Sequence, residues 1–280
     1  MADATSPSRI TDVEPIVRLA LAAYTAQLAG GDSERPFAVL PDGYTVRDME
    51  EFLPTPTRKR GKVRLNQLAS LVAYINAHKG PGTTIFARAD ATSIGAFLND
   101  HIPSSDPVAG ADWADHQAWY VAPLSPEWRT WTAQNKRPMA QADFAQFVED
   151  NLPDVAAPPA ADMLEISRTL QAKKKVAFAS GTRLENGQTQ FVYQEQIDGT
   201  AGAKGQLRVP ETFALGIPVF EGGPAYKLEA RLRYRISDQG ALTLWYDLLR
   251  AHKVLEHAFG EVVAEVAKGT GVAVLHGVRE

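Results

Sequence analysis

Alternating arginines in one short segment are the residues best suited to contact a polyanion. In residues 226–236, apolar and charged side chains alternate without a break. Because successive side chains of a β-strand point to opposite faces, this pattern predicts a half-buried strand with one charged face. The charged face carries Lys227, Glu229, Arg231, Arg233 and Arg235. Its arginines would lie roughly 6.5–7 Å apart, a spacing that suits the phosphates of one nucleic-acid strand.

The same charged face has a second interpretation that needs no ligand. Charge on the solvent-exposed side of a sheet requires no special function. In this interpretation the arginines pair with carboxylates such as Glu229 and Asp247, or they contact a partner subunit.

The densest positive run lies in residues 58–64. Its cations are Arg58, Lys59, Arg60, Lys62 and Arg64. We expect a basic loop here, which could bind phosphates with a strong dependence on salt. The alternative is a solvated connecting loop without a ligand.

Carboxylates and imidazoles gather in residues 100–116. The set is Asp100, His101, Asp112, Asp115 and His116. Such side chains could hold a divalent metal for hydrolysis, but their spacing matches no ligand signature and HExxH is absent. We therefore favour strand-edge histidines and turn-capping aspartates, and we assign no catalytic residue, metal or cofactor. Whether the protein is an enzyme is left open, and a non-enzymatic role is favoured.

The tryptophans near residue 125 are most simply part of a core. Trp119, Trp128 and Trp131 are the members of this group. One exposed tryptophan among them could instead stack on a nucleic-acid base.

Composition limits the class of protein. The chain of 280 residues is 45% hydrophobic, carries a net charge of −4 and has no cysteine. This excludes a disordered chain and a generally basic nucleic-acid coat, and it excludes disulfides and cysteine-ligated metals. We expect a cytoplasmic protein without a membrane span, since no 18 apolar residues run unbroken and no signal-peptide pattern is present.

Local signals predict an α+β fold. The first half is expected to be helix-rich around a small antiparallel sheet, a meander of strands at 83–87, 94–99 and 117–121. Ser125-Pro126 predicts a helix start. The second half is expected to form long antiparallel hairpins and a closing helix. One hairpin turns at Asn186-Gly187, and the other joins 226–236 to 241–248.

The expected domain boundary lies in a proline-containing segment near the middle of the chain. Residues 1–9 are expected to be a flexible tail, 10–152 an α+β region and 160–280 a β-rich region with a closing helix. Residues 153–159, with proline and alanine, are considered as a linker.

Several segments together resemble one known family. These are residues 97–101 (FLNDH), 113–120 (WADHQAWY), 125–131 (SPEWRTW), 141–150 (QADFAQFVED) and 217–234, where IPVFEGG precedes ARLRY. This order resembles the YfdQ-like family of temperate phages and prophages, which is functionally uncharacterised. The resemblance implies a phage early-region protein, often encoded among recombination and replication genes, and it supplies no catalytic residues.

Three functional hypotheses follow. The first is a non-enzymatic phage accessory protein that binds DNA or RNA, or a nucleoprotein complex, through the basic face and the basic run. The second is a homo-oligomeric assembly protein, or one that blocks a host or phage protein partner. The third is a metal-dependent hydrolase using Asp100, Asp112, Asp115 and His116.

Overall fold

The structure is a computed structural model, and it describes residues 18–20, 50–106, 109–183, 189–201, 207–237 and 241–279. For residues 172–183 and 189–200 only the backbone is described. The chain divides into two compact units, residues 1–59 and residues 60–280. Helices and two five-stranded sheets confirm the α+β class. The predicted tail, residues 1–9, lies outside the described residues.

The first unit is described over a short stretch only. Its 3-10 helix η1 spans Glu50–Phe52. The Glu50 carboxylate accepts hydrogen bonds from the backbone N–H and the hydroxyl of Thr57, at 2.7 and 2.6 Å.

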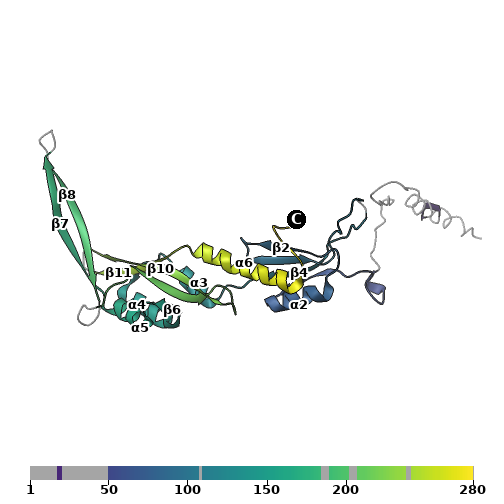
Figure 1. The fold of residues 1–280 in the computed structure, drawn as a ribbon, viewed down its shortest axis with the longest axis horizontal. Coiled ribbons are helices and arrows are strands. Elements are labelled where there is room, and N and C mark those ends of the chain that lie inside the picture. Colours follow the sequence, from purple (N-terminus) through teal and green to yellow (C-terminus); the bar gives the residue numbers. More distant parts are fainter. Residues whose placement is uncertain are drawn as a thin grey trace, which may run out of the picture. The chain divides into compact units, whose positions relative to one another are not determined.

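The first sheet of the second unit has the order β1-β4-β3-β2-β12. Figure 1 labels two of its strands, β2 and β4. Its strands are β1 Gly61–Leu65, β2 Thr84–Arg88, β3 Ser93–Phe97, β4 His116–Val121 and β12 Val274–His276. The antiparallel meander β2-β3-β4 confirms the prediction. The edge strands β1 and β12 were not predicted, and both pair in parallel with the meander.

The expected basic loop is wrong in part. Residues 61–65 form β1, which places Lys62 and Arg64 in a strand that pairs with β4. Val63 and Leu65 alternate with these two cations and are more buried than they are. The strand was not predicted because it has only two apolar core-facing residues. The surrounding positive charges obscure the alternation of apolar and polar side chains.

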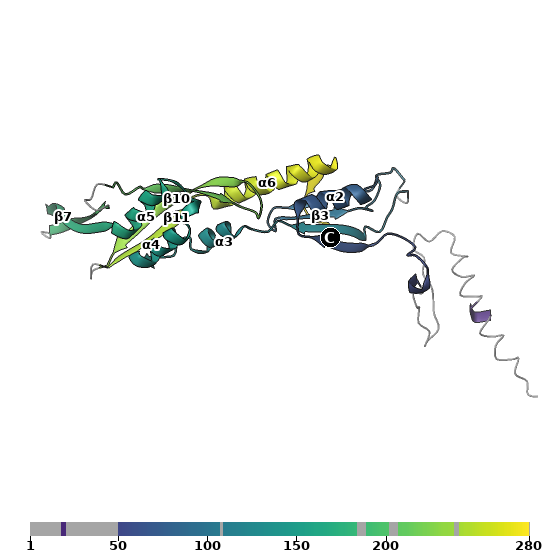
Figure 2. The same cartoon turned by 90° about the horizontal axis from the view of Figure 1, so that it is seen from below.

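Two helices cover one face of the first sheet. Helix α2, Leu68–His78, packs on β1 and β4, and helix α6, Ala251–Thr270, packs beside α2 (Figure 2). Leu71 and Ile75 of α2 are fully buried, with Ile85 and Ile94 of the sheet. Ala118 and Tyr120 of β4 face this core, so their neighbours Gln117, Trp119 and Val121 must face the opposite side.

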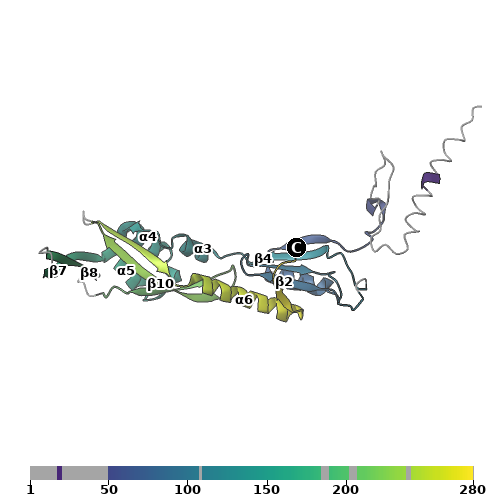
Figure 3. The same cartoon turned by 90° about the horizontal axis from the view of Figure 1, so that it is seen from above.

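The second sheet has the order β5-β11-β10-β9-β6. Its strands are β5 Met139–Ala140, β6 Val155–Ala157, β9 Thr212–Pro218, β10 Ala225–Ile236 and β11 Leu242–Leu248. Around it lie α3 Pro126–Ala133, α4 Gln141–Asp150, η2 Leu152–Asp154 and α5 Ala160–Thr169 (Figure 3). The predicted hairpin of β10 and β11 is confirmed, with Arg233 opposite Trp245.

A capped helix joins the two sheets along the chain. The Ser125 hydroxyl accepts a hydrogen bond from the Trp128 N–H at 3.0 Å, and Pro126 occupies the first helical turn. Both Trp128 and Trp131 are buried, as the core interpretation predicts. The Trp131 ring contacts Tyr246, whose hydroxyl donates to the Trp131 carbonyl at 2.6 Å.

The segment considered as a linker carries regular structure. Strand β6 pairs with β9, and Val155 is buried in the core of the second sheet. Residues 153–159 therefore lie inside the second unit and take part in its packing.

Strands β7, Gln171–Arg183, and β8, Thr189–Thr200, form an antiparallel hairpin. This confirms the hairpin, whereas its predicted turn at Asn186-Gly187 lies outside the described residues. In the part of the chain that the structure describes, no helix has the length and apolar character needed to cross a membrane.

Candidate nucleic-acid interface

The predicted arginine face exists on β10. Leu228, Ala230 and Leu232 are buried, whereas Arg233 and Arg235 are exposed and Arg231 is partly buried. The alternation in the sequence thus predicted the buried face of this strand, whereas Arg231, predicted to be exposed like Arg233 and Arg235, is only partly so. Its charged side, however, is not purely basic.

Carboxylates face most of the cations on this side of β10. Arg233 Nε lies 3.1 Å from Asp247 Oδ2, and Arg231 Nε lies 3.8 Å from Glu211 Oε1. Lys227 pairs with Glu229 at 2.9 Å. Among the described residues, only Arg235 of this face has no ion pair. A compensated face attracts phosphates weakly, which favours the interpretation in which the arginines pair within the chain.

The side of the first sheet away from α2 offers a different arrangement, which we call the open face. Residues 277–279 cover part of it, over β2 and β3. Strand register places Phe86, Gly95, Trp119 and Arg64 in one row across β2, β3, β4 and β1. The next row holds Thr84, Phe97, Gln117 and Lys62. Opposite residues of paired strands share a face, so aromatic and basic side chains meet on the side away from α2.

Three aromatic rings form a line on the open face; Phe86 and Trp119 are partly exposed, whereas Phe97 between them is buried beneath Arg279. The ring centroids of Phe86 and Phe97 are 5.8 Å apart, and those of Phe97 and Trp119 are 5.9 Å apart, each pair edge to face. A Cβ added to Gly95 would lie 2.9 Å from the Trp119 ring, so the indole occupies the space above this glycine. The Trp119 N–H donates to Gln117 Oε1 at 2.9 Å, which fixes the indole orientation.

Two cations flank this line without a carboxylate partner among the described residues. Lys62 Nζ lies 4.5 Å from the centroid of the Trp119 ring, a cation–π distance. Arg64 is exposed and lies opposite Trp119 in the β1–β4 register. Two other arginines at the open face are compensated, because Arg88 pairs with Asp90 at 2.7 Å and Arg279 pairs with Asp100.

Shallow hollows lie on both sides of Trp119. One, of about 460 Å³, is lined by Lys62, Phe97, Trp113, Gln117, Trp119 and Arg279. The other, of about 440 Å³, is lined by Lys62, Arg64 and Trp119 together with apolar and small residues. Trp113, 75% exposed, stands at the rim of the first hollow. Each hollow therefore combines an aromatic surface with a positive charge.

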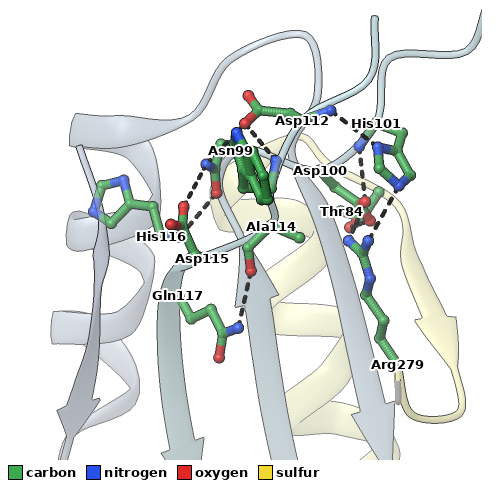
Figure 4. A network of polar contacts seen from close by, with 11 residues as sticks. Thr84, Asn99, Asp100, His101, Asp112, Ala114, Asp115, His116, Gln117 and Arg279 are labelled. Atoms are coloured by element: carbon green, nitrogen blue, oxygen red, sulfur yellow. Dashed lines mark hydrogen bonds and ion pairs between the residues drawn. The ribbon is translucent and has the colours of Figure 1, made fainter. Parts of the chain in front are cut away.

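The carboxylates considered for a metal are held by a polar network at the strand ends (Figure 4). Asp100 accepts hydrogen bonds from Thr84 and from the His101 N–H, at 2.6 and 2.7 Å, and pairs with Arg279. Burial opposes ionisation, yet these hydrogen bonds and the Arg279 charge hold the pKa of Asp100 below its ordinary value.

The other two aspartates share one amide. Asn99 Nδ2 donates to Asp112 Oδ1 at 3.2 Å and to Asp115 Oδ1 at 3.0 Å, while Asn99 Oδ1 accepts from the His116 N–H (Figure 4). Within the described ranges, no three acidic or histidine side chains are grouped to hold a metal ion. The network instead fixes the loop that carries Trp113 at the end of the open face.

Sequence reasoning found part of this site. Lys62 and Arg64 were predicted, and Arg60 precedes them, whereas Arg58 and Lys59 belong to the first unit. Trp119 was assigned with Trp128 and Trp131 to the core, and one tryptophan of the three was considered for stacking; the structure leaves Trp119 partly exposed. Phe86, Phe97 and Arg279 were missed. The alternation of residues 116–121, in which Gln117 and Trp119 occupy one face, was the available signal.

Comparison with known proteins gives a family and nothing further. Residues 10–279 match the family model described as uncharacterized conserved protein (DUF2303). No curated protein and no solved structure matches the chain.

Proposed function

We propose that this chain, which belongs to the DUF2303 family, binds single-stranded nucleic acid on its open face without catalysing a reaction. One observation carries the proposal. On the side of the first sheet away from α2, the partly exposed Trp119 ring lies beside two cations, Lys62 and Arg64, that have no carboxylate partner among the described residues.

Each component of the open face suits one component of a single strand. Unpaired bases stack on aromatic rings, which contributes about 1–3 kcal/mol per base. Lys62 and Arg64 supply the positive charge that phosphates require, and Arg64 can present two parallel N–H groups to one phosphate. In a duplex the bases are already stacked, so the rings could not reach their faces.

The biological setting in the proposal rests on resemblance alone. Segments such as residues 125–131 and 141–150 resemble the YfdQ-like family, which favours a phage or prophage accessory role in DNA metabolism. Single-stranded intermediates are common to recombination and replication, and the open face would act on them as a binding module.

The first test compares nucleic-acid forms. Fluorescence anisotropy with the whole chain should show at least about fivefold tighter binding of a labelled oligothymidine than of a duplex of equal length. Affinity should fall as salt rises, with a slope of about 0.7 per phosphate contacted. Equal affinity for the duplex would contradict the stacking role of the rings, and no binding at low salt would exclude the proposed function.

Self-association is proposed as an accompanying property. Strands β7 and β8 have 13 and 12 residues and form a two-stranded ribbon that pairs with no further strand in the described part of the chain. A ribbon of two strands is marginally stable in water, and its free edges can pair with another copy. We expect a dimer or larger assembly at micromolar concentration by light scattering. Replacing residues 173–198 with a short Gly-Ser linker should give a monomer, and a monomeric wild type would disprove the prediction.

A further inference from the structure

A larger hollow lies on the other side of β4 from the open face. Its volume is about 830 Å³, and its walls come from the start of α2, the end of β4, the β9–β10 turn and α6. The side chains that matter for its chemistry are Tyr120, Phe220, Glu221, Tyr226, Glu261 and Glu265. Trp119 and Tyr120 are consecutive residues of a strand, so the two sites cannot share a ligand.

The charge of this hollow is negative. Its lining includes three glutamates, and none of the described residues that line it is a lysine, arginine or histidine. Glu221 pairs with Arg129 outside the lining, at 2.9 Å, and Glu261 accepts a hydrogen bond from the Tyr226 hydroxyl. Glu265 has no partner within the described part of the chain.

Tyr120 points to a missing partner. Its side chain is only 6% exposed and lines the hollow, yet its hydroxyl makes no hydrogen bond with any described residue. Burial, together with the negative charges of Glu265 and Glu221, raises the pKa of Tyr120 above its ordinary value. Both glutamates line the same hollow as Tyr120. A hydroxyl that lines the hollow and has no partner from the described chain is free to hydrogen-bond to a ligand.

The neighbouring Tyr226 shows that a carboxylate of this hollow accepts a hydrogen bond from a tyrosine hydroxyl. The Tyr226 hydroxyl donates to Glu261, and burial, this hydrogen bond and the Glu261 charge raise the pKa of Tyr226 to about 12. Glu261 is thus already satisfied by a donor from the chain. Glu265 and Tyr120 are the pair left to bind a group from outside.

We propose that this hollow binds the primary ammonium group of an aliphatic amine. Glu265 would supply the opposite charge, and the Tyr120 oxygen would accept one ammonium N–H. The side chains of Phe220 and of Val262, a residue of α6, would contact the alkyl chain. An ammonium fits better than a metal ion, because no group of three ligating side chains is found among the described residues.

The ammonium group has two chemical sources, a free diamine or polyamine and a lysine side chain of a partner protein. Calorimetric titration of the nucleic-acid-free whole chain with spermidine should show saturable binding in 150 mM salt, about the physiological ionic strength. Pentane-1,5-diol, an uncharged analogue of a diamine, should not bind. Tighter binding of Nα-acetyl-lysine methylamide than of spermidine assigns the site to a lysine side chain, and the reverse order assigns it to a free amine.

Two variants and one matched control localise the site. Glu265→Gln should weaken spermidine binding about 10-fold, since a charge partner is removed. Tyr120→Phe should weaken it about threefold. Glu256→Gln removes the same charge from the exposed face of α6, outside the hollow and beside Lys253, and should leave affinity unchanged.

Two results would overturn the assignment of this hollow. One is no saturable binding of either amine to the folded wild type. The other is an equal loss in Glu265→Gln and Glu256→Gln, which would show general attraction of cations to an acidic surface. Neither result bears on the open face, whose nucleic-acid binding is measured separately.

Discussion

Replacing Trp119 by alanine should weaken binding of a single-stranded oligonucleotide by about 10- to 100-fold, which matches the loss of one to two stacked bases. Trp119 is the centre of the open face: its ring contacts Phe97, lies above Gly95 and carries Lys62 over its surface. The side chain is partly exposed on the side away from α2, so its loss should leave the core between the sheet and α2 intact. Anisotropy titration with labelled oligothymidine measures the effect.

The controls for Trp119 separate stacking from general damage. Trp119→Phe keeps an aromatic surface and should retain most of the affinity. Trp245→Ala removes the same side chain from β11 of the second sheet and should leave affinity within about twofold of the wild type. If Trp119→Ala binds as tightly as the wild type while thermal unfolding is unchanged, the aromatic line is not the binding surface.

Neutralising the two cations of β1 should have the second large effect. The double change Lys62→Gln and Arg64→Gln should reduce affinity at low salt by about 10- to 100-fold and lower the salt slope by about 1.4, or 0.7 for each lost phosphate contact. Neither cation has a carboxylate partner among the described residues, so removing them leaves no unpaired charge behind. Stability should therefore change little.

The matched control lies on the arginine face of β10. Arg233→Gln with Arg235→Gln removes the same number of charges from the same chain, and Arg233 already pairs with Asp247. We expect near wild-type affinity and an unchanged salt slope. If the β10 variant loses binding and the β1 variant does not, the nucleic-acid site lies on the second sheet, as the sequence alone first suggested.

Strong local signals explain which parts of the fold were predictable. The Ser125 cap, the meander and the alternation in β10 each depend on residues close together in sequence, and all three are confirmed. Strands β1, β6 and β12 were missed because each is short and obtains its hydrogen bonds from a strand far away in the chain. A run of three to five residues cannot show a period of two clearly.

The candidate site was only partly predictable for the same reason. Lys62 and Arg64 stand out as charges in the sequence, but their position beside Trp119 depends on the parallel register of β1 with β4. Phe86 and Phe97 become neighbours through the β2–β3 register. Conversely, the charged face of β10 was predicted correctly as a surface, while Glu211 and Asp247, which neutralise it, come from other segments.

The parallel pairing of β12 with β2 has a consequence for folding order. Val274 lies beside Ile85, and all the strands of the second sheet lie between them in the chain. Closing this long loop has a smaller entropic cost once the intervening residues are already folded. The second sheet and its helices should therefore form first. During synthesis on a ribosome, the meander β2-β3-β4 would leave the exit tunnel early. Strand β2, which carries Phe86, would then remain an unpaired edge strand until β12 is synthesised. Conditions that slow translation between the two sheets would prolong this incomplete state and its exposure to chaperones and proteases.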